Sequence, residues 1–424
     1  MAPGEIGVLR VYGGLVEIGL PGYEVILGDL TDGRKVTICM ASISNSQGGE
    51  TTRLQEFDTY ETLVGEHFDK PRAAAFDHVI VELRCLPAWV DVPIAFVDRP
   101  HNPGESWTLD VTDVNALTAQ VPELGQVSLG RRTMTRSGRG RASVEFEPQW
   151  ELALTEPMVL GDLLEEFVAP ILFLMTLVTG ERESVVKVSL VSTNEDGQSV
   201  VEWHGMNWIS YRVSRECPFL RSPHIPYSTF AERFDQVVPN WFRFHRVARE
   251  AMTTYFSGHM ANNRFAEDTF SNTVRSLEAW HRSYDKGLYI DETTYKALVN
   301  AMLAVLPEGH CQHFHDRLMH ANEISLKKRV EAMVVMAGPQ IAGAIAQFDK
   351  FARRVVDTRN AQAHRAELGD SFEPGELVTA TYLLAAVLDG VIARQIGFTD
   401  ADLVKTELHT QRWEFIRSGP LREN

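Results

Sequence analysis

Arg359, Asn360 and His364 form an R-N-x-x-x-H pattern near the end of an apolar stretch with helical spacing. In a helix, Asn360 and His364 lie one turn apart on the same face, and Arg359 borders that face. Arginine carries a fixed positive charge, an amide can orient an imidazole, and histidine titrates near neutral pH. These groups suit chemistry on a phosphodiester: the histidine would transfer a proton, and the guanidinium would stabilise charge on the phosphate oxygens.

The same residue types are also typical of the end of a helix. Arginine and histidine favour the last turn, where they interact with free carbonyl groups and with the negative end of the helix dipole. Spacing alone leaves the catalytic and the structural interpretations open. The choice between them depends on the elements that surround the pattern.

A second cluster of chemically active side chains has spacings that resemble part of a zinc site. Zinc sites in proteins usually combine two pairs of ligands, and the second pair is missing from this sequence. We therefore expect exposed histidines at a junction between a loop and a helix, and no metal or cofactor. The cluster consists of His310, Cys311, His313, His315 and His320.

A third cluster is a run of arginines interspersed with glycine and serine. It could contact RNA phosphates through a flexible loop, or it could be the solvated end of a β-hairpin. We favour the hairpin, because the aromatic residues that would stack on bases are absent from the run. Its arginines are Arg131, Arg132, Arg136, Arg139 and Arg141.

The composition is typical of a globular protein. The chain has 424 residues, of which 44% are hydrophobic and 9% aromatic, so two or three domains are expected. The longest apolar run, Val168 to Val178, is too short to span a membrane. The first ten residues lack a basic start followed by an apolar block, so we expect no signal peptide and no membrane partner.

Cysteine usage bears on the compartment. The four cysteines have no paired spacing, and such residues are typical of reduced thiols in cytosolic proteins. We therefore expect free thiols and a cytoplasmic location. The cysteines are Cys39, Cys85, Cys217 and Cys311.

The net charge of −16 at first argues against a nucleic-acid partner. Its distribution is uneven. Residues 1–229 hold 18 Lys and Arg against 32 Asp and Glu, whereas the remaining residues hold 23 against 25. The part of the chain that contains the R-N-x-x-x-H pattern is therefore nearly neutral and can carry a local basic patch for phosphate.

The first half of the chain has strand character. β-Branched and aromatic residues alternate there, broken by glycine and proline pairs, and Asp32-Gly33 predicts a hairpin. A helical stretch from Gly161 to Leu177 accompanies the strands, so we expect a sandwich-like or curved sheet with a helix. The expected strands are Val8 to Val16, Tyr23 to Leu30, Lys35 to Ser42, Ala75 to Leu86, Ile94 to Val97, Ser106 to Val111, Gln126 to Arg132, Ala142 to Trp150, Ser184 to Ser192 and Ser199 to Trp203.

The second half has helical character. Apolar residues recur there at spacings of three and four, which predicts a helical bundle. The fold class is therefore α+β, with a β-rich domain at 1–215, a proline-rich linker at 216–229 and a helical domain at 230–424. The expected helices are Phe230 to Tyr255, Arg264 to Tyr284, Asp291 to Leu306, Ile324 to Met336, Pro339 to His364 and Glu373 to Ile396.

This combination resembles the ApeA-like group of the HEPN superfamily, which are bacterial abortive-infection proteins that act against phage. The resemblance is carried by Arg359, Asn360 and His364, by the helix before them, and by a helix around Thr273 to Arg282. The first half is similar to the N-terminal domain that accompanies this HEPN domain. The resemblance therefore covers most of the chain.

The resemblance implies a metal-independent endoribonuclease that leaves a cyclic phosphate and a 5′-hydroxyl on its RNA substrate. His364 would be the proton-transfer residue, Arg359 the phosphate-binding residue, and Asn360 would position the histidine or the RNA. Because one motif supplies one histidine, a homodimer through the HEPN domain is expected to complete the site. The N-terminal domain would sense a phage-derived activator or restrain the nuclease. Glu278, Trp280 and His281 would support the motif as structure.

Two alternatives remain from the sequence. In the first, the bundle is a non-catalytic dimerisation or binding module, and the N-terminal domain recognises a phage or host component. In the second, the HEPN domain is modified by, or inhibits, a separately encoded enzyme. Ser/His/Asp catalysis and nucleotide-binding loops receive no support, because neither G-x-S-x-G nor a P-loop occurs in the sequence.

Overall fold

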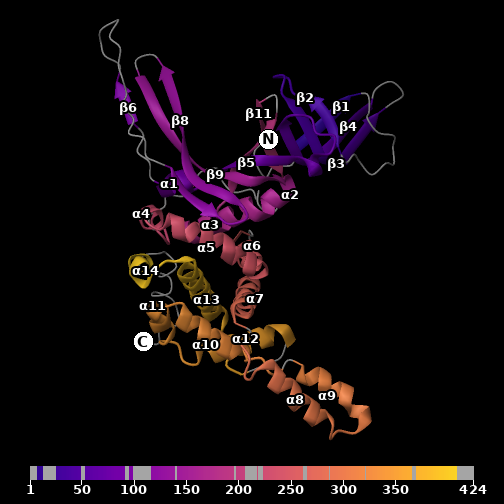
Figure 1. The fold of residues 1–424 in the computed structure, drawn as a ribbon, viewed down its shortest axis with the longest axis vertical. Coiled ribbons are helices and arrows are strands. Elements are labelled where there is room, and N and C mark those ends of the chain that lie inside the picture. Colours follow the sequence, from indigo (N-terminus) through magenta and orange to yellow (C-terminus); the bar gives the residue numbers. More distant parts are fainter. Residues whose placement is uncertain are drawn as a thin grey trace. The chain divides into compact units, whose positions relative to one another are not determined.

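The computed structural model divides into two compact units, Met1–Phe242 and Arg243–Asn424, coloured from indigo to yellow along the chain in Figure 1. The structure describes residues 7–12, 25–48, 53–90, 95–98, 116–138, 141–194, 197–205, 217, 223–260, 265–285, 287–319, 321–364 and 369–407.

The strands of the described part form one antiparallel sheet in the N-terminal unit. Its order is β2-β3-β4-β11-β10-β5-β9-β8-β7, with β1 paired to β4 and β6 paired to β9. The strands are β1 (Gly7–Tyr12), β2 (Ile26–Asp29), β3 (Lys35–Gly48), β4 (Arg53–Gly65), β5 (Ala75–Leu83), β6 (Ala95–Asp98), β7 (Leu117–Val121), β8 (Gly125–Gly138), β9 (Arg141–Val159), β10 (Val185–Asn194) and β11 (Gly197–Gly205).

One face of the sheet is apolar and the other is charged. Val79 of β5 lies opposite Leu152 of β9 and Leu190 of β10, and all three side chains are fully buried. On alternate positions the side chains are polar, as in the ion pair of 2.7 Å between Lys187 and Glu202. Because side chains alternate along a strand, this register places the apolar residues on one face, where a second layer covers them.

Helix α3 (Ala169–Thr179) forms the core of that second layer. All eleven of its residues are buried, and it ends at Gly180, whose φ of 71° is the left-handed conformation typical of a helix C-cap. It continues α2 (Leu160–Leu163) through a π-turn, η2 (Leu164–Val168), so the helix expected at Gly161 to Leu177 is confirmed.

Further helices of the N-terminal unit cover α3. Trp241 donates a hydrogen bond of 2.9 Å from Nε1 to the carbonyl oxygen of Pro170 in α3. Phe234 stacks on Trp150 of the sheet with ring centroids 5.8 Å apart. In Figure 1, α3 lies between the strands and this outer layer. The short helices of the unit are η1 (Pro71–Ala73), α1 (Leu86–Val90), α4 (Tyr227–Ala231) and the first part of α5 (Phe234–Val247).

The division between the units differs from the boundaries expected at 1–215, 216–229 and 230–424. The boundary between the units lies directly after Phe242, because the aromatic residues of α4 and α5 cover the sheet and α3. Phe242 itself stacks on Phe167 of η2 at 6.1 Å. Residues 230–242, which have a helical pattern, therefore belong to the unit that contains the sheet.

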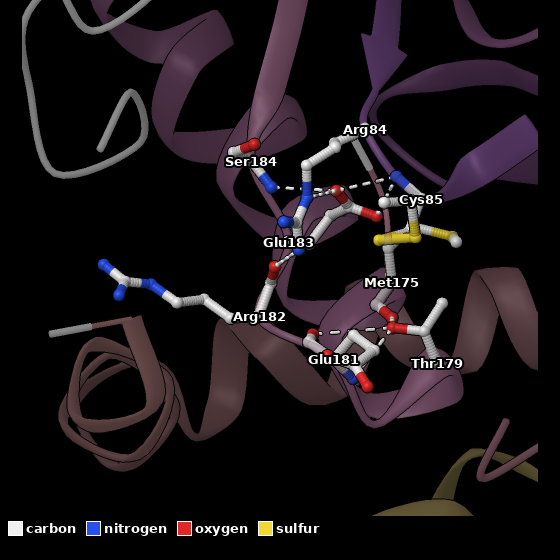
Figure 2. The surroundings of a disulfide bond; sticks show 9 residues. Arg84, Cys85, Met175, Thr179, Glu181, Arg182, Glu183 and Ser184 are labelled. Atoms are coloured by element: carbon white, nitrogen blue, oxygen red, sulfur yellow. Dashed lines mark hydrogen bonds and ion pairs between the residues drawn. A yellow bond between two sulfur atoms is a disulfide. The ribbon is translucent and has the colours of Figure 1, made fainter. Parts of the chain in front are cut away.

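The prediction of four reduced thiols is wrong for two of the cysteines. Cys85 and Cys217 form a disulfide with Cα atoms 5.0 Å apart, drawn in Figure 2. Cys39 and Cys311 are free. The partners are 132 residues apart, and a bond across such a separation leaves no spacing pattern in the sequence.

The second unit is helical and is built around α13 (Pro374–Ile396). This helix is long and apolar enough to cross a membrane, but 78% of its most apolar window is buried inside the protein, as in the core helix of a bundle. Tyr255 of α6 donates a hydrogen bond of 2.7 Å to Asp389 of α13. The other elements are α6 (Arg249–Met260), α7 (Ala266–Tyr284), α8 (Glu292–Leu303), η3 (Glu308–His310), α9 (Cys311–Leu318), α10 (Leu326–Met336), α11 (Pro339–Ile345), α12 (Phe351–His364) and α14 (Asp400–Glu407).

The expected helix Pro339 to His364 is wrong as a single element. It consists of α11 and α12, separated by a turn in which Lys350 has a φ of 51°. A non-glycine residue in this left-handed conformation cannot continue a right-handed helix. The expected helix Phe230 to Tyr255 is likewise divided, into α4, α5 and α6.

Four elements were not predicted, namely β4, β7, α9 and α14, and the expected strand Ser106 to Val111 lies outside the described residues. The fold class is confirmed: a β-rich N-terminal part with a buried helix precedes a helical part.

We expect Trp241→Phe to lower the free energy of unfolding by about 1–3 kcal/mol, because the carbonyl of Pro170 loses this buried donor. Denaturant unfolding would measure the change. Val200→Thr, at a strand residue that is 55% exposed, is the control and should stay within about 0.5 kcal/mol of the parent chain. A Trp241→Phe midpoint equal to that of the control would contradict this role.

Candidate functional site

Helix α12 carries the R-N-x-x-x-H pattern on its last two turns. Phe351, Val355 and Thr358 are buried, and their spacing of four and three places them on one side of the helix. Arg359 and Asn360 are half-buried and follow directly. The motif therefore begins where the buried side of α12 meets the surface of the helical unit.

Two hydrogen bonds anchor the last turns of α12. Ser271 of α7 donates from Oγ to Oε1 of Gln362 at 2.7 Å. The hydroxyl oxygen of the buried Thr358 accepts from the backbone N–H of Phe372 at 2.9 Å. The first bond fixes the motif turn to α7, and the second fixes it to the segment that leads into α13.

An aromatic cluster lies beneath these anchors. Phe372 packs between Phe351 of α12, with ring centroids 5.9 Å apart, and Phe270 of α7, at 6.3 Å. The guanidinium of Arg354 lies 4.4 Å from the ring centroid of Phe372 and also pairs with Glu376 in the first turn of α13. The cluster joins α7, α12 and the start of α13, and it fixes the direction in which α12 ends.

Within the motif, Nη1 of Arg359 donates to Oδ1 of Asn360 at 3.3 Å. The amide thus holds the guanidinium, a contact that the sequence analysis did not predict. The helix continues through His364, which places its backbone one turn beyond Asn360. The side chain of His364 lies outside the described part of the structure, so its expected contact with Asn360 stays a prediction.

Glu278, Trp280 and His281 of α7 have structural partners. Glu278 pairs with Arg282 at 3.0 Å, and Trp280 is buried and stacks on Tyr284. His281 Nδ1 lies 2.9 Å from Nη1 of Arg329. Because arginine only donates hydrogen bonds, Nδ1 of His281 must accept one. This nitrogen therefore carries no proton, and the imidazole is neutral.

Burial and the nearby positive charge of Arg329 lower the pKa of His281, in agreement with that tautomer. Arg329 also pairs with Glu323 at 3.2 Å. His281 thus belongs to a buried network near the C-terminal end of α7, whereas Ser271 lies near its start. The imidazole of His281 is hydrogen-bonded to Arg329 in that network.

The histidine cluster lies on η3 and α9. Among the residues that the structure describes, no three His, Cys, Asp or Glu side chains come together to hold a metal ion. The thiol of Cys311 lies 3.6 Å from the carbonyl oxygens of Leu303 and Pro307, and His315 is exposed beside Asp316. His320 lies outside the described residues.

Four arginines of the run lie on strands β8 and β9, which form the hairpin favoured from the sequence: Arg131, Arg132, Arg136 and Arg141. Arg132 pairs with Glu147 across the hairpin and approaches Glu82 at 4.0 Å. The side chains of Arg136, Arg139 and Arg141 lie outside the described part.

Two protein-family models match the chain. Residues 2–241 match the family described as ApeA N-terminal domain 1, and residues 271–402 match the Apea-like HEPN family. A sheet-based N-terminal unit followed by a HEPN helical unit defines the class of protein, and the motif lies within the HEPN match. The chain belongs to the ApeA-like HEPN family. Comparisons with curated proteins and with solved structures gave no match.

Family membership implies a role in anti-phage defence that involves a HEPN domain. HEPN domains are commonly nucleases. The motif was predicted from its residue types, whereas Ser271, Thr358 and Gln362, which position it, were not. Serine, threonine and glutamine carry no signal of such a role in one sequence, because each is common on helix surfaces.

We expect Ser271→Ala to loosen the last turn of α12, because Gln362 loses its donor on α7. A bond worth about 1 kcal/mol corresponds to roughly fivefold faster hydrogen exchange at the amides of residues 360–363. Ser283→Ala is the control, because its hydroxyl bonds to Ala279 within α7 itself. Equal exchange in both variants would show that the anchor does not hold the motif turn.

Proposed function

We propose that this protein is a metal-independent endoribonuclease of anti-phage defence that cleaves RNA through Arg359, Asn360 and His364. The observation that carries the proposal is the end of α12. There the helix runs unbroken through the motif, and Asn360 holds the guanidinium of Arg359 at a half-buried position anchored to α7. This positive group lies in the part of the chain that is nearly neutral overall.

The chemistry needs few groups, because RNA carries its own nucleophile. The 2′-hydroxyl oxygen attacks the adjacent phosphorus, the bond from phosphorus to the 5′ oxygen breaks, and the products are a cyclic phosphate and a 5′-hydroxyl. One proton leaves the 2′ oxygen and one is added to the 5′ oxygen, and we assign one of these two transfers to His364. Arg359 stabilises the negative charge on the phosphate oxygens during the reaction.

One motif supplies one histidine, whereas the reaction both removes and adds a proton. We propose that the chain forms a homodimer through its helical unit, so that the motif of a second copy completes the site. The half-buried Arg359 is accessible to such a partner and to RNA. The N-terminal unit would then sense a phage-derived activator in the cytoplasm and control the nuclease.

We expect His364→Ala and Arg359→Ala each to reduce RNA cleavage at least about 100-fold, because each removes a group that acts only in the transition state. Incubation with total RNA in the presence of a chelator, followed by mapping of the cut ends, would measure this. Arg353→Ala is the matched control: it lies on the same helix, is exposed and pairs only with Asp357 among the described residues. Full cleavage by folded His364→Ala would exclude the proposed role of the motif, whereas no cleavage by the parent chain would favour a non-catalytic binding module.

The need for a second copy predicts how the rate depends on protein concentration. Below the dimer dissociation constant, the cleavage rate should rise about as the square of the concentration, and above it in direct proportion. Dilution series with sedimentation at the same concentrations would test this. A strictly proportional rate from a monomer would show that one copy holds a complete site.

A further inference from the structure

The disulfide lies just after the end of β5, and one of its two cysteines is fully buried. Cys85 is fully buried, whereas Cys217 is half-buried. Attack by a thiolate from solution is therefore assigned to the sulfur of Cys217, the more exposed of the two residues. Thiol–disulfide exchange begins with attack on one sulfur, and the other sulfur leaves as a thiolate. Here the leaving group is the buried sulfur of Cys85.

A buried carboxyl group is hydrogen-bonded to the backbone of the same cysteine. Glu183 is 2% exposed and accepts hydrogen bonds of 3.1 and 3.0 Å from the backbone N–H of Cys85 and one of 2.8 Å from that of Ser184. Figure 2 shows its side chain directed toward Cys85 from the segment that precedes β10. The backbone of Arg84 is bonded to that of Ser184 at 3.1 Å, which holds the two segments together.

We propose that Cys85–Cys217 is a redox-active disulfide and that Glu183 supplies the proton to Cys85 when a dithiol reduces it. A thiolate of the dithiol attacks Cys217 Sγ, and the bond to Cys85 Sγ breaks with its electron pair going to Cys85. The neutral carboxyl of Glu183 gives its proton to that sulfur and becomes a carboxylate. The second thiol of the dithiol loses its proton to water and attacks the sulfur that is bonded to Cys217. The sulfur of Cys217 leaves with the electron pair and takes up that proton from water, and the former dithiol is released as a cyclic disulfide.

The groups around Glu183 suit proton transfer near neutral pH. Burial raises the pKa of Glu183 to about 7, against the opposing hydrogen bonds from Ser184 and Cys85 and the charge of Arg84. Arg84 lies 4.0 Å away and Glu181 lies in the same segment, where burial raises its pKa as well. The neighbours from α3 in Figure 2, Met175 and Thr179, do not titrate. At neutral pH a substantial share of Glu183 is therefore neutral and able to donate.

The test is the rate at which dithiothreitol exposes Cys85 in the full chain, measured by alkylation and peptide mass spectrometry and expressed per dithiothreitol thiolate. At pH 7 we expect Glu183→Gln to react at least about tenfold more slowly, because an amide cannot donate a proton. Glu181→Gln is the matched control, since it changes the same charge near Arg84 but does not bond to Cys85, and it should match the parent chain within about twofold.

The parent chain alone gives a second test, which holds even if Glu183→Gln fails to fold. With a pKa of about 7, the neutral fraction of Glu183 falls about tenfold between pH 6 and pH 8, and the rate per thiolate should fall with it. A rate per thiolate that is constant over this range would overturn the proposal. So would equal rates in the two variants, or alkylation of Cys85 before any reductant is added.

Discussion

The burial of two helices that have no polar face determines how both units are built. A helix of this kind is stable only when other elements cover it all round. In α3 all eleven residues are buried, between the apolar face of the sheet and the aromatic residues of α4 and α5. Helix α13 has the same role in the helical unit, where Leu383, Leu384 and Val387 are fully buried. The other elements are arranged around these two.

The segment that leads into α13 also sets the position of the candidate site. The first residues of α13 are exposed, and the residues just before them pack against α12. Phe372 of that segment packs on Phe351 and Phe270, and its backbone bonds to Thr358. The last turn of α12 is thereby held at the surface, supported from below by aromatic rings and from the side by α7. The packing around Phe372 thus holds the half-buried Arg359 at the surface of the helical unit.

Sequence patterns predicted the elements that depend on local periodicity. Helices α7, α8, α10 and α13 lie within three residues of their expected bounds, and α7 buries Val274, Leu277 and Trp280 on one repeating face. The division between α11 and α12 was missed, since the left-handed Lys350 gives no signal in residue type. The pairing of Cys85 with Cys217 and the anchors Ser271–Gln362 depend on contacts between distant residues, which composition and spacing do not contain.

The two chemical sites inferred here rest on one physical requirement. A group that transfers a proton or stabilises charge works when its surroundings fix it before the reaction, so that nothing has to reorganise in the transition state. Asn360 gives Arg359 such a partner, and the backbone of Cys85 and Ser184 gives one to Glu183. The sites differ in burial, and that difference decides their substrates. The half-buried guanidinium can meet a polyanion from solution, whereas the enclosed carboxyl can serve only the sulfur beside it.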